Sequence, residues 1–593
     1  MKSTSIITRI FLTVICQLSL AAVLAQDINR ELILVRPYEP SVSDAQKITT
    51  LPSLRDTFII KPTFVYSIQS RRIDTRFDVS PITPARLQPL PQPKLYRGYI
   101  KLGAGTLPNV HGEVALNTVR NKEYSAGALF RLDRAGGNVK LENEEKVFAG
   151  YNDLSGKVFA NKFYHSSILY GEIGASGQTA YNYGYDTKSS APIDTTFARG
   201  DITKRYFFTD ANIGLRSSQF KTDQLNFDVK LGYKSAHNKL DDMYIHPNHI
   251  PEPDSKGYVR YNENAVNFKA QLDNNMFGGN LNFDMFNRSH PFDSLRNNFA
   301  IDFNPWFMLD NDSVRMQVGM RLAAYREGDG NMQYKIYPKI EFQFTLLKDI
   351  FIPFVGIDGY LSPNTYRNII TENPFVTPGL TVPITNTKLQ IYAGLKGTIT
   401  NKLSYYFRGD FSTSENAYFF VNDTSYSRAQ NYFNVVTGDL NIVSLKGELY
   451  FNPVESIDFG LKATHFTYQP SNQSRAWHRP QYTLEFLAKY NLRNKIIVNF
   501  DVMNIGKRYA KLFDFSPAPI PDPDADPDPD LEPKVDFYTL NSVIAFNLGI
   551  EYRYTRSFSL FLKLNNISGA KYERWNFFPS HRFNLMGGFT YSL

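Results

Sequence analysis

The chain has almost no cysteine and no long apolar run. Its single cysteine, Cys16, lies in an N-terminal leader, so a mature chain that has lost the leader contains none. This absence excludes disulfides and thiolate metal sites from the mature protein. Beyond the leader no stretch of 18 apolar residues occurs, which excludes transmembrane helices. The formal net charge of +8 is spread over 593 residues, so we expect no nucleic-acid partner.

Residues 1–25 predict a secretory signal peptide. Lys2 and Arg9 supply the positive start, residues 10–20 are mostly apolar, and residues 23–25 (VLA) offer a cleavage site. We expect cleavage near Ala25. The apolar stretch is too short for a membrane anchor, and the bulky residues before Cys16 argue against a lipoprotein signal. The chain is therefore interpreted as an exported protein.

Aromatic residues are abundant, with 46 Phe and 37 Tyr against 3 Trp. Residues 26–95 are rich in proline and show no sustained period, which indicates an irregular segment in the periplasm or the lumen. From Tyr96 onward, apolar and polar residues alternate in segments such as 225–234, 336–346 and 544–553. This period of two predicts strands with one apolar and one polar face. A soluble antiparallel sheet would show the same alternation as a transmembrane barrel, so the lengths of the connections between strands decide between these two folds.

The connections between the predicted strands are of two kinds. We count about 22 strands from Tyr96, and the connections after even-numbered strands are short and polar while those after odd-numbered strands are long. The short turns lie at 120–123, 310–312, 401–402, 493–495 and 555–556, and the long connections at 187–203, 241–256, 361–385, 412–430 and 507–535. This asymmetry is typical of outer-membrane barrels, whose short turns are periplasmic. Residues 96–593 are therefore predicted to form an all-β, porin-like transmembrane antiparallel barrel with long extracellular loops.

The C-terminal residues 581–593 (HRFNLMGGFTYSL) fit the closing strand of such a barrel. Phe583, Leu585, Phe589, Tyr591 and Leu593 share one parity, so one face is apolar up to the carboxylate. A barrel requires a complete last strand because that strand pairs with the first and removes the edge.

The same residues resemble the insertion signal of outer-membrane barrels. Met586, Gly588, Tyr591 and Leu593 match its apolar, glycine and two apolar or aromatic positions, although Leu593 replaces the usual Phe. The resemblance implies outer-membrane lipid and the outer-membrane assembly machinery as partners.

The stretch 564–593 resembles the last two strands of TonB-dependent receptor barrels. An Asn-containing turn, a Lys-Tyr pair and a Pro shortly before an Arg carry the resemblance, at Asn565, Lys571, Tyr572, Pro579 and Arg582. Compared with the family pattern, one extra residue lies between Pro579 and Arg582. The resemblance covers about residues 96–593 and implies the 22-stranded barrel of that family. The family's plug domain, of well over a hundred residues, does not fit between the leader and Tyr96, so a barrel without a recognisable plug is expected.

Residues 56–60 resemble a TonB box. Asp56, Thr57, Phe58, Ile59 and Ile60 form an acidic-Thr-apolar stretch, which implies that TonB could add to it as a strand partner. The alternative is a short β-prone segment, residues 58–68, that lies in the lumen or along the periplasmic rim.

No catalytic, metal or cofactor motif is recognisable. His246 and His249 share a long loop with two aspartates, and a Pro/Asp tract spans residues 522–536. Both are interpreted as solvated loops rather than cation sites. His465 and His478 show no recognisable spacing to a nucleophile, so we expect no enzyme, no metal and no cofactor.

These observations predict a protein of the outer membrane of a Gram-negative bacterium. The leading hypothesis is a receptor-like barrel that transports solutes or polymers, or serves as the barrel subunit of an envelope complex with a periplasmic or surface lipoprotein. A lumen of this width would leak, so folded-in loops, residues 26–95 or a partner should occlude it. The alternative is a non-transporting scaffold or assembly factor with a filled lumen, and a lesser alternative is an enzyme at the rim.

Overall fold

The computed structural model describes residues 95–187, 199–200, 202–219, 224–239, 260–290, 293–423, 431–513 and 537–593. All of them belong to one compact unit that begins at Pro91. The predicted signal peptide and the TonB-box-like residues 56–60 lie outside the described residues. Among the described helices, none is long and apolar enough to cross a membrane.

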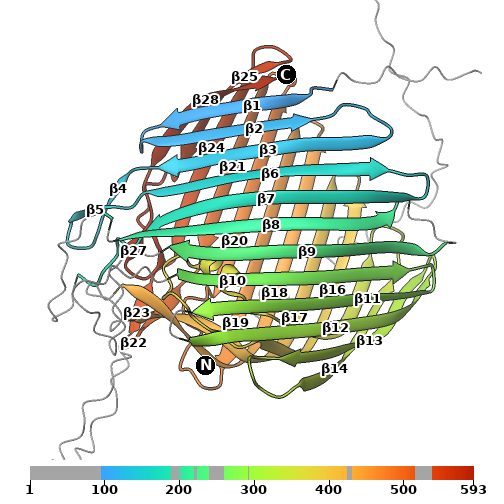
Figure 1. Cartoon of the computed structure of the whole chain (residues 1–593). Coiled ribbons are helices and arrows are strands. Elements are labelled where there is room, and N and C mark those ends of the chain that lie inside the picture. The colour runs from blue at the N-terminus through green and yellow to red at the C-terminus, as the bar shows by residue number, and fades with distance from the viewer. Residues whose placement is uncertain are drawn as a thin grey trace, which may run out of the picture. The chain divides into compact units, whose positions relative to one another are not determined.

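Twenty-two antiparallel strands form a closed barrel (Figure 1), as predicted from the sequence. Each strand pairs with the preceding and the following barrel strand, and the last pairs with the first. The barrel strands are β1 (Gly98–Gly105), β2 (Asn109–Asn117), β3 (Tyr124–Ala135), β6 (Tyr151–Phe163), β7 (Ser167–Tyr181), β8 (Thr203–Ser217), β9 (Asn226–Lys239), β10 (Arg260–Asp273), β11 (Phe277–His290), β12 (Asp293–Asp310), β13 (Val314–Arg326), β14 (Gln333–Phe344), β15 (Ile352–Ser362), β16 (Thr385–Thr400), β17 (Leu403–Asp423), β18 (Tyr432–Val454), β19 (Ile457–Pro470), β20 (Tyr482–Leu492), β21 (Ile496–Ile505), β24 (Val543–Arg553), β25 (Phe558–Asn565) and β28 (Asn584–Ser592).

The C-terminal strand closes the barrel. β28 pairs with β1, so that Met586 lies opposite Gly105, Gly588 opposite Gly103, and Tyr591 opposite Ile100. Gly588 is required by this close approach, because a Cβ there would lie 2.1 Å from the carbonyl oxygen of Leu102 and 2.5 Å from the ring of Phe561. An aromatic ring over paired glycines is a known way to stabilise such a position.

The two faces of the wall follow the parity of the sequence. Outward positions such as Val158, Ile173 and Leu445 leave 60%, 66% and 62% of their surface exposed, as a lipid-facing surface requires. Inward positions carry charges that pair across the lumen wall. Examples are Arg321–Asp302 at 3.2 Å and Lys446–Glu448 at 2.6 Å.

The short turns are built by asparagine. Asn121, Asn274 and Asn311 each accept hydrogen bonds from the backbone N–H groups two and three residues further on. An Asx side chain replaces a backbone partner in this way and fixes a tight turn. These turns share one rim, and the long connections share the other, as the sequence predicts. The exceptions are the connection 106–108 and the step from His290 to Asp293, which are short although they lie at the long-loop rim.

The predicted long connection 412–430 is wrong over most of its length. β17 continues to Asp423, where it pairs with Tyr432 at the start of β18. The reason is that Phe419, Phe420 and Val421 are buried against other long-loop segments, so this hairpin is extended by tertiary packing rather than by alternation.

Candidate functional site at the long-loop end of the lumen

A loop folds into the long-loop end of the barrel. Residues 363–384, between β15 and β16, contain the helix α2 (Tyr366–Glu372), whose N-cap Thr365 accepts a hydrogen bond from the Asn368 N–H at 3.2 Å. Tyr366, Ile369 and Ile370 lie on one helical face and are 0% exposed. They pack on inward side chains of the barrel strands β8, β9 and β10. We call residues 363–384 the inserted loop.

A buried ion pair on the barrel wall holds the start of α2. The Arg288 guanidinium (β11) lies 3.0 Å from the Glu263 carboxylate (β10), and their side chains are 5% and 3% exposed. Glu263 also accepts from the N–H groups of Tyr366 at 2.7 Å and Arg367 at 3.2 Å. Arg288 in turn donates to the carbonyl oxygen of Asn364 at 2.6 Å. Both charges therefore have partners on the wall and in the loop, as buried charges require.

Strand β8 holds the rest of the inserted loop. The Asp210 carboxylate accepts from the Arg367 guanidinium at 2.6 Å. Tyr206 donates its hydroxyl to the carbonyl oxygen of Pro374 at 2.7 Å, and the Lys204 ammonium donates to that of Val376 at 3.1 Å. Polar groups of the wall thus satisfy the backbone of a loop that would otherwise be buried without partners.

A second loop, residues 566–583, completes the closure. It carries the short strands β26 (Glu573–Trp575) and β27 (Phe578–Pro579). The ring of Phe578 stacks on Phe375 of the inserted loop at 4.0 Å between centroids, and Trp575 contacts Phe420 at 4.9 Å and Phe433 at 5.7 Å. We call these five residues the aromatic cap. They join two long loops to the extended β17–β18 hairpin.

His478 is a structural residue of the same closure. It lies in the loop 471–481, contacts Trp575 at 5.4 Å between ring centroids, and is buried. Its Nδ1 lies 2.9 Å from the carbonyl oxygen of Phe420, and its Nε2 lies 3.4 Å from the N–H of Asn576. A neutral ring with the proton on Nδ1 satisfies both contacts, and burial lowers the pKa of His478 to about 4. Both nitrogens are thus engaged with backbone groups.

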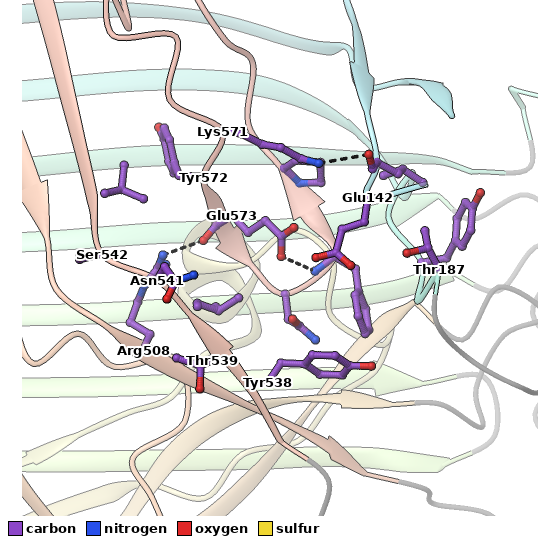
Figure 2. Close-up of a pocket in the computed structure, with 17 residues that line it drawn as sticks. Glu142, Thr187, Arg508, Tyr538, Thr539, Asn541, Ser542, Lys571, Tyr572 and Glu573 are labelled. Carbon is purple, nitrogen blue, oxygen red and sulfur yellow. Dashed lines mark hydrogen bonds between the residues drawn. The ribbon is translucent and has the colours of Figure 1, made fainter. Parts of the chain in front are cut away.

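The short strands β4 (Asn138–Lys140), β5 (Lys146–Phe148), β22 (Arg508–Phe513) and β23 (Phe537–Leu540) also lie at the long-loop end of the barrel (Figure 1). Between them lies a cavity of about 250 Å³. Figure 2 shows Arg508 and Lys571 on its wall, each donating to a backbone carbonyl, of Glu573 at 2.7 Å and of Leu141 at 3.1 Å. Burial raises the pKa of the Glu573 carboxyl. The cavity wall is polar and of mixed charge.

The other predicted candidates are not brought together. His465 lies on β19 opposite the exposed Leu445, on the outward face of the barrel. His246, His249 and the tract 522–536 lie outside the described residues. Within the described ranges no group of three metal-ligating side chains occurs. The sequence predicts the long connection 361–385 and folded-in loops as one possible occluder, but it did not identify this loop as the one that folds inward, although Tyr366, Ile369 and Ile370 have the helical spacing of a buried face.

No protein-family model and no curated protein matches the sequence. Solved structures do. The FrpB iron transporter from Neisseria meningitidis has a TM-score of 0.63 and 10% identity, over 84% of this chain and 82% of its own. The copper transporter OprC has a TM-score of 0.59 and 12% identity, over 84% of this chain and 80% of its own. The pyoverdine outer membrane receptor FpvA from Pseudomonas aeruginosa PAO1 has a TM-score of 0.59 and 11% identity, over 84% of this chain and 78% of its own. The chain has the fold of a TonB-dependent receptor barrel.

This likeness confirms the resemblance seen in residues 564–593 at the level of the fold, since the identities are low. The receptor-type barrel positions the closure described above. Long β17 and β18 raise Phe420 and Phe433 to the aromatic cap, while β8 to β11 present the anchors of the inserted loop. The inserted loop thus lies between the wall strands β8 to β11 and the aromatic cap.

Proposed function

We propose that this protein is a transport barrel of the Gram-negative outer membrane whose own long loops close the lumen in the resting state. The observation that carries the proposal is the inserted loop, with its buried helical face and its charged anchors on the wall. The receptor-type fold supports a transmembrane location, and transporters and receptors share it. We propose no catalytic role, because His478 is engaged on both nitrogens and His465 faces outward.

A second candidate function is a scaffold or barrel subunit of an envelope complex whose lumen stays closed. The complete burial of Tyr366, Ile369 and Ile370 favours it, because a permanent seal would bury the same apolar face. A periplasmic or surface lipoprotein would then be the partner. The two functions differ in whether the inserted loop can move out of the lumen.

Conductance across planar bilayers tests the proposal. Ser362 and Thr385 are paired in register at the base of the inserted loop, so a short hairpin turn can replace residues 363–384 without shifting β15 or β16. We expect large currents after this replacement and brief openings of the intact protein. A parallel deletion of residues 26–95 measures the N-terminal segment separately. Currents only after that deletion would assign occlusion to residues 26–95, and silence of all three forms would refute the transport function.

Coupling to TonB is a separate proposal that rests on residues 56–60. TonB should be captured by the intact protein and lost on Thr57→Pro, because proline removes a backbone donor from an added strand. No capture by the intact protein would dismiss the box. Cleavage near Ala25 is likewise proposed, and the N-terminal sequence of the purified protein tests it.

A further inference from the structure

Four lysines surround a hollow in the lumen wall. Lys157, Lys230, Lys234 and Lys269 line a cavity of about 430 Å³ that also contains the side chains of Glu172 and Asp210. Positive side chains therefore outnumber carboxylates around it. The strands that carry them, β6 to β10, lie side by side in the barrel wall (Figure 1).

Two of the lysines form an electrostatically unfavourable pair when no ligand is bound. Lys230 on β9 lies directly opposite Lys269 on β10 in the strand register. Like charges in directly opposite positions destabilise a sheet. In the described part of the chain, Lys230, Lys234 and Lys269 make no ion pair within 4 Å, whereas Lys157 lies 4.0 Å from Glu172.

The nearby carboxylates balance the lysines only in part, because other groups share them. Asp210 lies opposite Lys234 in the strand register but also accepts from Arg367 of the inserted loop at 2.6 Å, and Glu172 accepts from the Asn212 amide at 3.0 Å. Asp228, on the same face of β9, accepts from the Tyr170 hydroxyl at 2.7 Å. Asp284 on β11 lies opposite Asn267 and does not line the hollow, but its carboxylate is close enough to interact electrostatically with Lys269 and Lys234. Around the hollow the four lysines therefore meet carboxylates that are shared with other partners, and none of these carboxylates lies within 4 Å of Lys230 or Lys269 in the described part of the chain.

A glycine beside the hollow makes room for two of the amides that line it. Gly232 lies opposite both Asn212 and Asn267, and a Cβ at Gly232 would lie 2.0 Å from the Asn267 Oδ1 and 2.6 Å from the Asn212 Oδ1. The missing side chain lets both amides lie between the lysines. The Asn267 Oδ1 is buried without a hydrogen-bond partner, and a rotated amide would present its N–H₂ donors instead.

We infer that this hollow binds an oxyanion group of a solute, a phosphate or a carboxylate, inside the lumen. Lysine ammonium groups bind such anions as point charges, and the two amides supply neutral hydrogen bonds. Asp210 connects the site to the inserted loop, because it lines the hollow and accepts from Arg367. The inference concerns binding at equilibrium and does not depend on transport.

Isothermal titration calorimetry of the full-length protein in an uncharged detergent tests it, with inorganic phosphate and citrate as probes at low ionic strength. The double variant Lys230→Gln/Lys269→Gln should weaken binding by at least about tenfold. The matched control is Lys446→Gln, because Lys446 also faces the lumen but is paired with Glu448 at 2.6 Å. We expect this control to bind as the unchanged protein does.

The two probes distinguish the class of anion, since the tighter one identifies phosphate or carboxylate as the preferred group. A barrel in which a hairpin turn replaces residues 363–384 repeats the titration with an open lumen. Equal affinity of the double variant and the Lys446→Gln control would overturn the inference. Absence of binding in both the intact and the opened barrel would overturn it as well.

Discussion

Loss of the Glu263 charge should release the inserted loop. In Glu263→Gln the buried Arg288 guanidinium loses its ionic partner at 3.0 Å, and the N–H groups of Tyr366 and Arg367 keep at most a neutral acceptor. Both side chains of the pair are at least nine-tenths buried. Removing one partner of a buried pair costs about 3–5 kcal/mol because the other charge is left without compensation. When the loop is released, the Arg288 side chain on β11 is hydrated by the lumen, so the cost of the missing carboxylate falls on the closed state.

The lower end of this range sets the expected effect. About 3 kcal/mol corresponds to roughly a hundredfold increase in the population of the open state. A cysteine at position 369, where Ile369 is 0% exposed, reports on opening, because a thiol reagent reaches it only after the loop leaves. When the loop closes faster than the reagent reacts, the labelling rate follows the open population. The Cys16→Ser background makes this thiol unique.

The comparison is between Glu263→Gln and Glu448→Gln, both carrying Ile369→Cys. Glu448 also faces the lumen and pairs with Lys446 at 2.6 Å, but it does not contact the inserted loop. We expect labelling roughly a hundredfold faster in the first variant than in the second. Equal labelling rates in the two would refute the argument that the Glu263–Arg288 pair anchors the loop.

Three further predictions concern pH, closure and the lysine hollow. Burial lowers the pKa of His478 to about 4 from an ordinary 6.5, so its stabilisation of the cap is complete above pH 6.5 and is lost as the pH falls toward 4. The labelling rate at position 369, divided by the rate in His478→Gln at the same pH, should therefore rise as the pH falls through this window; the division removes the slowing caused by loss of the thiolate, which both variants share. Burial raises the pKa of Glu573, and this group acts in the opposite sense in both variants. Gly588→Val should prevent pairing of β28 with β1 and abolish the heat-modifiable folded band on gels, whereas Ser592→Val should retain it. Lys269→Glu places a carboxylate opposite Lys230 and should raise the melting temperature at low salt, because the new cross-strand interaction contributes about 0.2–1 kcal/mol. The same variant should bind phosphate more weakly. An unchanged melting temperature would contradict the proposed repulsion between Lys230 and Lys269.

The barrel itself was predictable from the sequence because its wall obeys a local rule. Alternation fixes the face of each residue, and turn residues such as Asn311 fix the ends of strands, so the count of 22 and the pairing of the last strand with the first follow from local patterns. The closure was not predictable in this way. Glu263, Arg288 and Asn364 are brought together by a loop that crosses several strands, and nothing in their sequence spacing encodes that contact.

The extended hairpin of β17 and β18 also shows that local alternation does not reveal tertiary packing. Phe419 and Phe420 are adjacent and both buried, so they violate the alternation expected of a strand with one wet face. This doublet indicates a loop when it is judged by period alone. In the structure it is strand, because above the lipid-facing wall both faces of the hairpin are covered by neighbouring loops. Periodicity reports how many faces are buried, and it identifies a strand only where one face is wet.

The chemistry of the anchors bears on the choice between a transport barrel and a permanent scaffold. A permanent seal gains most from packed apolar side chains, since replacing a buried ion pair by hydrophobic residues of similar volume is often neutral or stabilising. The inserted loop instead meets the wall through Glu263–Arg288 and Asp210–Arg367, next to the apolar face of α2. Both wall carboxylates and Arg288 regain hydration if the loop withdraws, because they line a polar lumen. Charged anchors of this kind lower the difference in free energy between the closed and open states. They favour a loop that leaves over one that only fills space.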